Sequence, residues 1–282
     1  MIKIISDSST LYSIEQGKKQ NVDIAPLVVT INKKTYKEFE EINTNEFIEL
    51  IQEGHIPISS QPSIGEVVEL YEKYPSDEII NISMADGLSG TYNSACMAKD
   101  MVPHANNITV INSKTLCGPQ RYLVDTAVKL AEAGQDKSVI ITTLNQLIHH
   151  SKSYLIPNDF DFLVRGGRLS PLVGRIGGAI KLVPVMVLSE DGKTLEKFTT
   201  KRTFTKAIQK ICEDLKEANV DETYKLYVTH ACKEELANAA VATIKNNIEN
   251  ADVDVMLLSP AFTTQGGPGC IAIQAIKKYE VK

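Results

Sequence analysis

The sequence of 282 residues has no long apolar run and no excess of positive charge. Nothing in it reaches the roughly 18 apolar residues that a membrane-spanning helix needs. The opening MIKIISDSS also lacks the apolar core of a secretory signal. A formal net charge of -5 argues against a broad nucleic-acid surface, which requires basic residues to neutralise phosphates. We therefore expect a soluble, cytoplasmic protein with no stable membrane insertion and no nucleic-acid partner.

Cysteine is infrequent, and its spacing is irregular. The five cysteines are widely separated, with no C-x-x-C pair of the kind used for metal binding or redox chemistry: Cys96, Cys117, Cys212, Cys232 and Cys270. Free cysteine usually behaves as a small buried apolar residue. We therefore expect five reduced thiols in the core of a protein from a reducing compartment.

The common catalytic signatures are missing as well. The sequence has no G-x-S-x-G elbow, no H-E-x-x-H motif and no G-x-x-x-x-G-K-[ST] phosphate loop, and its GGPG segment is not a dinucleotide fingerprint. Of the five histidines, only His230 is placed like a site residue, at the carboxyl end of a predicted strand, and a structural role fits it equally well. We predict no catalytic residue, no metal and no cofactor.

Hydrophobic patterning predicts an α/β protein. Short runs rich in Ile and Val alternate with segments of helical periodicity, as in parallel sheets built from β-α units. Pro, Asp and paired Gly residues between positions 154 and 178 mark a boundary. We predict an N-terminal lobe of residues 1–155 and a C-terminal lobe of residues 156–282, each with a mainly parallel sheet and flanking helices.

The predicted strands cover residues 3–6, 23–31, 78–83, 108–112, 181–188, 195–199, 225–230 and 253–258. The predicted helices cover 45–53, 63–74, segments beginning near 91 and 118, and then 139–150, 203–218, 234–248 and 271–278. Asp191-Gly192 is expected to form a hairpin turn.

Four predicted loops are rich in hydroxyl groups or glycine: SDSST at 6–10, SSQPS at 59–63, LSGTYNS at 88–94 and TTQGGPG at 263–269. Ligands of open α/β sheets lie where such loops lead into helices, and helix N-termini favour carboxylate or phosphate groups. The same residues also serve simply as helix caps and turns. The loops therefore indicate a binding site for a small acidic head group, with helix capping and turn formation as the alternative interpretation.

Three arginines are further candidates for binding an anion. Arg165 and Arg168 bracket Gly166-Gly167, and Arg202 follows a predicted strand. An arginine at the mouth of a cleft holds a carboxylate or phosphate at two points. Exposed arginines with no ligand are equally familiar on protein surfaces.

Read in order, these segments resemble the DegV family of bacterial fatty-acid-binding proteins. The resembling stretches span about residues 3–280: SDSST, APLVVT at 25–30, SSQPSIGE at 59–66, GLSGTYNSA at 87–95, LVRGGRLS at 163–170 and GGPG. The resemblance implies a two-lobed fold that holds one long-chain fatty acid between the lobes, with its acyl chain in an apolar tunnel. It also implies a partner fatty acid kinase that phosphorylates the bound acid and supplies the ATP and metal.

The resemblance also assigns roles to particular residues. The fatty-acid carboxyl group is expected at Ser59, Ser60, Ser89, Gly90 and Gln265, and kinase coupling at Arg202. One position departs from the family pattern, because Gln265-Gly266 stands where His-Thr is usual. Glutamine can hydrogen-bond a carboxyl group but cannot become cationic or carry a proton.

Two other functions remain open from the sequence. One is an enzyme acting on a small carboxylated or phosphorylated metabolite, with His230 as base and an arginine as clamp. The other is a binder of an apolar acid with no kinase partner, which Gln265 makes credible. A polar cleft would favour the enzyme, whereas a long apolar tunnel would contradict it.

Overall fold

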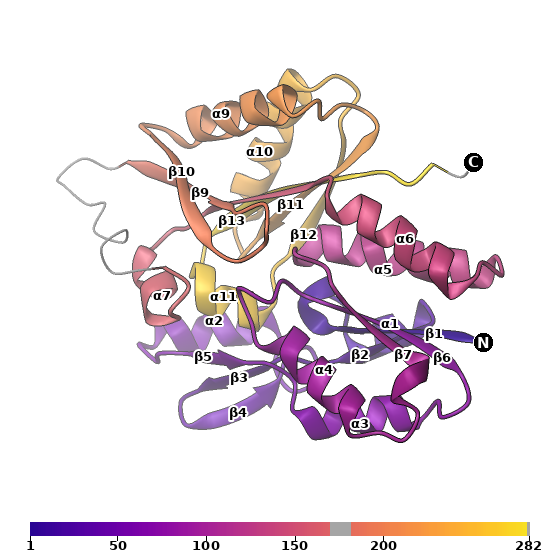
Figure 1. Ribbon diagram of the computed structural model, residues 1–282. Coiled ribbons are helices and arrows are strands. Elements are labelled where there is room, and N and C mark those ends of the chain that lie inside the picture. Colours follow the sequence, from indigo (N-terminus) through magenta and orange to yellow (C-terminus); the bar gives the residue numbers. More distant parts are fainter. Residues whose placement is uncertain (170–181, 281–282) are drawn as a thin grey trace.

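The computed structural model describes residues 1–169 and 182–280 (Figure 1). The segment GRIGG at 174–178, together with Ser170 and Lys181, lies outside the described residues. Two large sheets, one in each half of the chain, lie one above the other (Figure 1).

The N-terminal sheet contains four parallel strands in the order β2-β1-β6-β7, namely β1 (Ile2–Asp7), β2 (Val22–Ala25), β6 (Glu78–Ser83) and β7 (Ile108–Asn112). Successive side chains in a strand point to opposite faces. Ile5 and Ile79 therefore pack on one face, toward α3 (Ile64–Glu72) and α4 (Thr91–Asp100). The other face carries Ile4 and Ile80, which pack against α5 (Cys117–Glu132) and α6 (Lys137–Ile148). The predicted parallel sheet is correct for this lobe.

The C-terminal sheet is mixed, and the expectation of a mainly parallel sheet is wrong there. Its order is β10-β9-β8-β13-β11-β12, with β8 (Ser151–Ile156), β9 (Val183–Leu188), β10 (Leu195–Lys201), β11 (Tyr224–His230), β12 (Asp252–Leu257) and β13 (Ile271–Lys277). Only β11 and β12 run parallel. The turn at Asp191-Gly192 makes β9 and β10 an antiparallel hairpin, and β13 returns antiparallel between β8 and β11.

The predicted final helix over 271–278 is also wrong, because this segment forms β13. Ile271 and Ile273 face the core between the sheet and the helices that cover its outer face. The alternate residues Ala272 and Gln274 face the other side of the sheet and line a cavity. A strand buried on both faces has no clean polar alternation, and a short apolar run of this kind cannot be distinguished from a helix by periodicity.

The single predicted strand over 23–31 is instead two strands in different sheets. Pro26 and Leu27 separate β2 from β3 (Val28–Ile31), and proline has no N–H for a sheet ladder. β3 forms a small antiparallel sheet with β4 (Lys34–Lys37) and β5 (Ile58–Ser60). Against this small sheet pack α2 (Thr44–Gln52) and α11 (Pro260–Gly266), so a late segment of the chain contacts the N-terminal half before β13 joins the C-terminal sheet.

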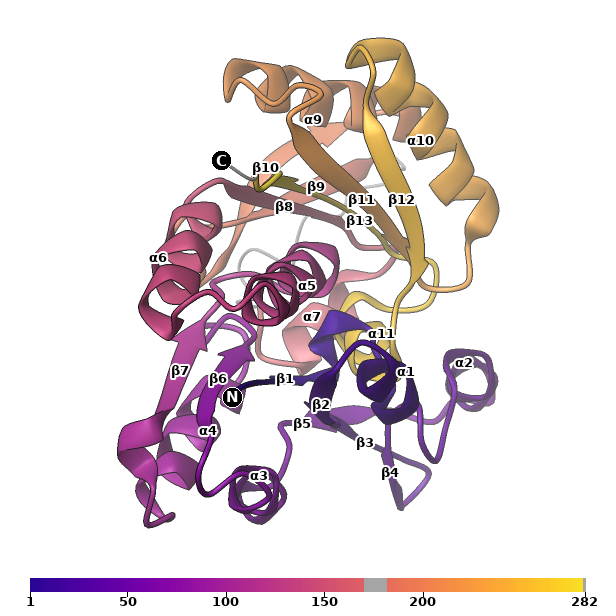
Figure 2. The same ribbon diagram turned by 90° about the vertical axis from the view of Figure 1, so that its right-hand side faces the viewer.

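The helices form layers around the two large sheets. α9 (Phe204–Glu217) and α10 (Glu234–Asn247) cover the outer face of the C-terminal sheet. α5 and α6 lie between the two sheets (Figure 2). Tyr227 of β11 and Ile276 of β13 join the same core cluster as Leu123 of α5. Within residues 1–169 and 182–280, the remaining short helices are α1 (Ile14–Lys19), α7 (Phe160–Arg165) and the 3-10 turns Ser8–Thr10 and Ala105–Asn107.

The expected lobe boundary between residues 155 and 156 falls inside β8, which pairs with β13 and β9 in the C-terminal sheet. The division into two lobes at that position stays a prediction. None of the described helices combines the length and hydropathy needed to cross a membrane. Three cysteines are buried as expected, whereas Cys96 and Cys232 are partly exposed.

Candidate functional site

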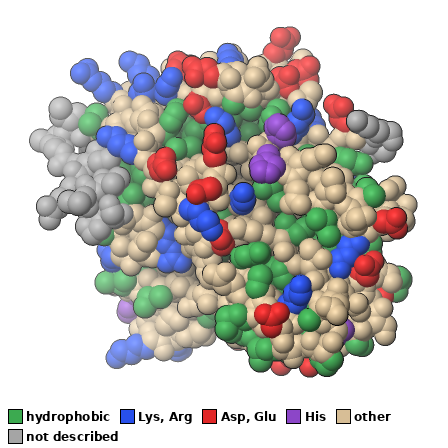
Figure 3. Space-filling view, viewed as in Figure 1, with side chains coloured by type: hydrophobic (Ala, Val, Ile, Leu, Met, Phe, Trp, Pro, Cys, Tyr) green, Lys and Arg blue, Asp and Glu red, His purple; other side chains and the backbone are tan. Residues whose placement is uncertain are grey.

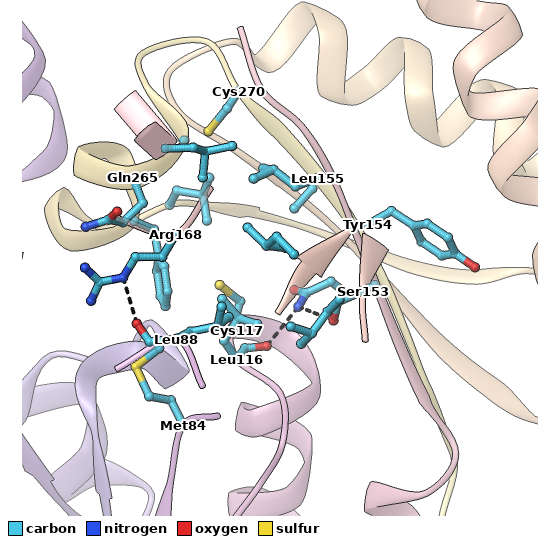
Figure 4. A pocket seen from close by; sticks show the side chains of 18 residues that line it. Met84, Leu88, Leu116, Cys117, Ser153, Tyr154, Leu155, Arg168, Gln265 and Cys270 are labelled. Carbon is cyan, nitrogen blue, oxygen red and sulfur yellow. Dashed lines mark hydrogen bonds between the residues drawn. The ribbon is translucent and has the colours of Figure 1, made fainter. Parts of the chain in front are cut away.

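A cavity lined mainly by apolar side chains lies between the C-terminal sheet and the loops that follow β6 and β7 (Figure 4). Its volume is about 100 Å³. The N-terminal lobe contributes the loops after β6 and β7, with Met84, Leu88 and Leu116. The rest of the wall comes from β8, α7, α11, β13 and the β9-β10 hairpin, including Leu155, Leu163, Leu188, Leu195, Phe262, Cys270 and Ala272. Such a lining binds hydrocarbon and offers little to a polar metabolite.

A smaller polar cavity adjoins the apolar one. Its volume is about 40 Å³, and it shares five lining residues with the larger cavity: Met84, Leu88, Arg168, Phe262 and Gln265. The polar residues around it are Ser59, Ser60, Gln61, Ser89, Arg168 and Gln265. We call these six residues the polar mouth. Loops SSQPS, LSGTYNS and TTQGGPG therefore meet at one place, although they lie far apart in the sequence.

Three of the six are held by local structure. Ser59 lies in β5, opposite Val29 of β3. Ser89 precedes α4 and its hydroxyl contacts that of Thr91 at 2.8 Å, as expected before a helix N-terminus. Gln265, near the end of α11, donates from Nε2 to the Ser59 hydroxyl at 2.9 Å, while its buried Oε1 has no partner among the described residues.

Gly90 lies behind the polar mouth and lines neither cavity. A Cβ added at this position would lie 3.1 Å from the Gln61 amide, so the small residue lets Gln61 pack closely. Gln61 in turn contacts Ser94 of α4 at 3.4 Å. Gly90 therefore supports Gln61 and offers no side chain to a ligand.

Arg168 is the cation of the polar mouth. It is half-buried, and its Nε donates to the Leu88 carbonyl at 2.9 Å, across the two lobes (Figure 4). A second donor contacts the Gly166 carbonyl. Burial lowers the pKa of the Arg168 guanidinium, but an arginine remains charged at neutral pH. Its remaining N–H groups can bind a carboxylate.

The other two candidate arginines lie elsewhere. Arg165 is exposed and rests over the Phe162 ring at 4.6 Å, so it does not form a pair with Arg168 at the cavities. Arg202 is exposed just after β10, outside both cavities. Figure 3 shows Lys and Arg side chains gathered at the upper left, over the start of α9.

The SDSST loop does not line the polar mouth, contrary to the grouping of the four loops. Its side chains are buried, with Ser6, Asp7 and Ser9 hydrogen-bonded to Gln120 and Ser8 hydrogen-bonded to Glu38, a residue that the sequence analysis missed. Ser8 donates to Glu38 Oε1 at 2.5 Å, and the Ala261 N–H donates to Oε2 at 2.9 Å. Glu38 therefore anchors the start of α11, the helix that carries Gln265. Burial raises the pKa of Glu38 to about 7.

His230 lies outside the two cavities. Its Nδ1 accepts a hydrogen bond from the Lys233 N–H at 3.1 Å, and burial lowers its pKa. The proposed base of a metabolite enzyme is therefore not at the site. Among the described residues, no group of three His, Cys, Asp or Glu side chains is arranged to hold a metal ion.

Comparisons with known proteins agree with this architecture. A family model described as "Uncharacterised protein, DegV family" matches residues 1–278. The DegV domain-containing protein SA1258 of Staphylococcus aureus is 32% identical over 98% of both chains.

Solved structures share the fold along nearly the whole chain. The crystal structure of DegV from Bacillus subtilis, described as a fatty acid binding protein, is 29% identical, with a TM-score of 0.85 over 98% of this chain and 99% of that one. A DegV family protein from Thermus thermophilus is 24% identical, with a TM-score of 0.87 over 98% and 99% of the two chains. The full-length family match and the close relative establish that this chain belongs to the DegV family.

Proposed function

We propose that the protein binds one long-chain fatty acid, with the acyl chain in the apolar cavity and the carboxyl group at the polar mouth. The observation that carries this proposal is the direct junction of an apolar cavity with a mouth that contains one arginine and several hydroxyl groups. The similar DegV of Bacillus subtilis, described as a fatty acid binding protein, supports it. Each buried CH₂ contributes about 0.8 kcal/mol, which favours long chains.

The geometry also supports different roles for the serines, Arg168 and Gln265 at the carboxyl group. The hydroxyl groups of Ser59, Ser60 and Ser89 donate hydrogen bonds, and Arg168 supplies the counter-charge that a partly buried carboxylate requires. Gln265 holds Ser59 in place. The cavity of about 100 Å³ is smaller than the roughly 300–1,000 Å³ of most ligand pockets, so its side chains must move apart to admit a long chain.

Native mass spectrometry followed by solvent extraction tests the proposal. We expect one long-chain fatty acid for each protein chain, either carried through purification or taken up when it is offered. A protein that is empty and remains empty with every fatty acid offered would contradict it.

The matched variants Arg168→Ala and Arg165→Ala test the polar mouth. Loss of a charged hydrogen-bond donor at Arg168 is expected to weaken fatty-acid binding about tenfold. The Arg165 variant, which changes an exposed arginine outside both cavities, is expected to bind like the wild type. Equal affinities of the two variants would exclude Arg168 as a carboxyl ligand.

We propose further that the protein is a cytoplasmic carrier subunit that presents the carboxyl group to a partner fatty acid kinase. No histidine or carboxylate is among the described residues that line the polar mouth, which supports a division between binding and catalysis. Arg202 is exposed, with Lys201 and Lys206 close in sequence, so it is available to a partner. Gln265 cannot carry a proton, which leaves any proton transfer to the kinase.

The variant Arg202→Ala tests this coupling. With a fatty acid kinase and ATP, acyl phosphate formation is expected to fall about tenfold, because an interface charge is lost, while fatty-acid affinity is unchanged. Lys245→Ala, an exposed lysine of α10, is the control and should leave both properties unchanged. Fatty-acid binding without phosphorylation by any kinase would favour an apolar-acid binder that acts alone.

A further inference from the structure

The apolar cavity has a polar deep end. Gln274 of β13 and Ser153 of β8 line it and are partners in the sheet register. Both are buried, Gln274 with only 2% of its surface exposed. Figure 4 shows Ser153 on the opposite side of the cavity from Arg168 and Gln265. The neighbouring cavity-lining positions are Cys270, just before β13, and Ala272, and both are apolar.

Two hydrogen bonds fix the orientation of the Gln274 amide. Its Nε2 donates to the Leu116 carbonyl at 3.0 Å and to the Ser153 hydroxyl at 2.9 Å. These two bonds use both hydrogens of the amide nitrogen. A flipped amide would place its oxygen against the Leu116 carbonyl oxygen, which is repulsive. The free acceptor is therefore Oε1.

This acceptor has no partner among the described residues and is fully buried. The leucines that line the same cavity, such as Leu116, Leu155 and Leu188, have no hydrogen-bond donor in their side chains. A buried acceptor without a partner destabilises the protein, because its hydrogen bond to water is lost and not replaced. A plain hydrocarbon chain cannot remove that cost, whereas a hydroxyl group on the chain can.

We propose that the protein selects a fatty acid with a hydroxyl group on its chain, and that Gln274 Oε1 accepts the hydrogen bond from that hydroxyl. This selectivity rests on the proposed fatty-acid binding. It narrows the ligands of the same cavity from fatty acids in general to hydroxy fatty acids. Gln274 is then the residue that determines specificity, at the end of the cavity opposite the polar mouth.

Affinities of the wild-type protein for stearic acid and for a series of hydroxystearic acids test the proposal directly. The series places the hydroxyl at carbon 2, 10, 12 or 18. One isomer with a distant hydroxyl is expected to bind about tenfold more tightly than stearic acid, because it satisfies the acceptor. The 2-hydroxy acid holds its hydroxyl beside the carboxyl group, where only Gln265 Oε1 is a free acceptor among the described residues, so any gain it shows should persist in a Gln274 variant.

The variants Gln274→Leu and Gln274→Met remove the acceptor and retain an apolar side chain of similar size. Both are expected to bind stearic acid at least as well as the wild type and to lose the preference for the hydroxy acid. If neither variant folds, the wild-type series still decides the question.

The outcomes separate the two proposals. A wild-type protein that binds stearic acid and every distant hydroxy isomer equally would overturn the role of Gln274, with a water molecule as the partner of Oε1. A polar cleft beyond Ser153 could supply that water, since the two spaces share Ser153 and Leu188. Failure of every fatty acid to bind would instead overturn the proposed function.

Discussion

Replacement of Ala272 by phenylalanine is expected to weaken the binding of long-chain fatty acids about 100-fold and to shift the preference toward shorter chains. Ala272 points from β13 into the apolar cavity, between Cys270 and Gln274. A phenyl ring at this position occupies space that the acyl chain would fill. Displacing about four CH₂ groups loses about 3 kcal/mol, at about 0.8 kcal/mol each.

Affinities measured across saturated acids of increasing length check this prediction. The longest acids should lose most and the shortest least, because only long chains reach the ring. Val255→Phe, which adds the same ring at an exposed position of β12, is the control and should leave the length profile unchanged. An Ala272→Phe protein that keeps its fold and its wild-type length profile would show that the acyl chain lies elsewhere.

The stability of the protein is expected to fall by up to about 3 kcal/mol between about pH 4.5 and pH 7, through Glu38. Burial raises the pKa of this carboxyl group to about 7 in the folded protein, above its ordinary value of 4.5. In that interval the unfolded chain releases the proton that the folded chain retains. The free energy of unfolding therefore decreases as the pH rises, and it levels off above pH 7.

Denaturant unfolding of the wild type and of Glu38→Gln across this pH range measures the effect. The variant should show a weaker dependence on pH, because its amide does not titrate. Buried Asp7, whose pKa is also raised by burial, and buried Cys117 are the titratable neighbours. Glu49→Gln, at an exposed position of α2, is the control. An unchanged slope in Glu38→Gln would assign the pH dependence to other carboxyl groups whose pKa is raised by burial, such as Asp7 and Asp125.

Much of the polar mouth is predictable because short motifs carry it. The motifs SSQPS and LSGTYNS mark Ser59, Ser60 and Ser89 as candidates from the sequence alone, although Ser59 and Ser60 lie in β5 and not in a loop. The motifs do not predict that three such loops lie close together in space, because this depends on contacts between segments that are distant in the sequence. Gly90 lies in the same loop as Ser89 and lines neither cavity, and its role at the carboxyl group stays a prediction.

Sequence analysis missed Glu38 and Gln274, and it did not distinguish Arg168 from Arg165. Glu38, Arg168 and Gln274 each form a hydrogen bond with a residue more than 75 positions away in the sequence. The partners are Ala261 for Glu38, Leu88 for Arg168 and Leu116 for Gln274. No spacing within the sequence encodes these contacts. The mixed sheet was missed for a related reason, because the direction of β13 is set by its neighbours β8 and β11.

The position of α5 and α6 between the two sheets has a consequence for how the protein folds and opens. These helices complete the core of the N-terminal sheet and also cover the inner face of the C-terminal sheet. Neither half of the chain can therefore bury its apolar surface alone, and folding joins both halves in one cooperative transition. A hinge that parts the lobes would expose this shared layer to water. Ligand entry therefore depends on local rearrangement around the cavities, with the central layer intact.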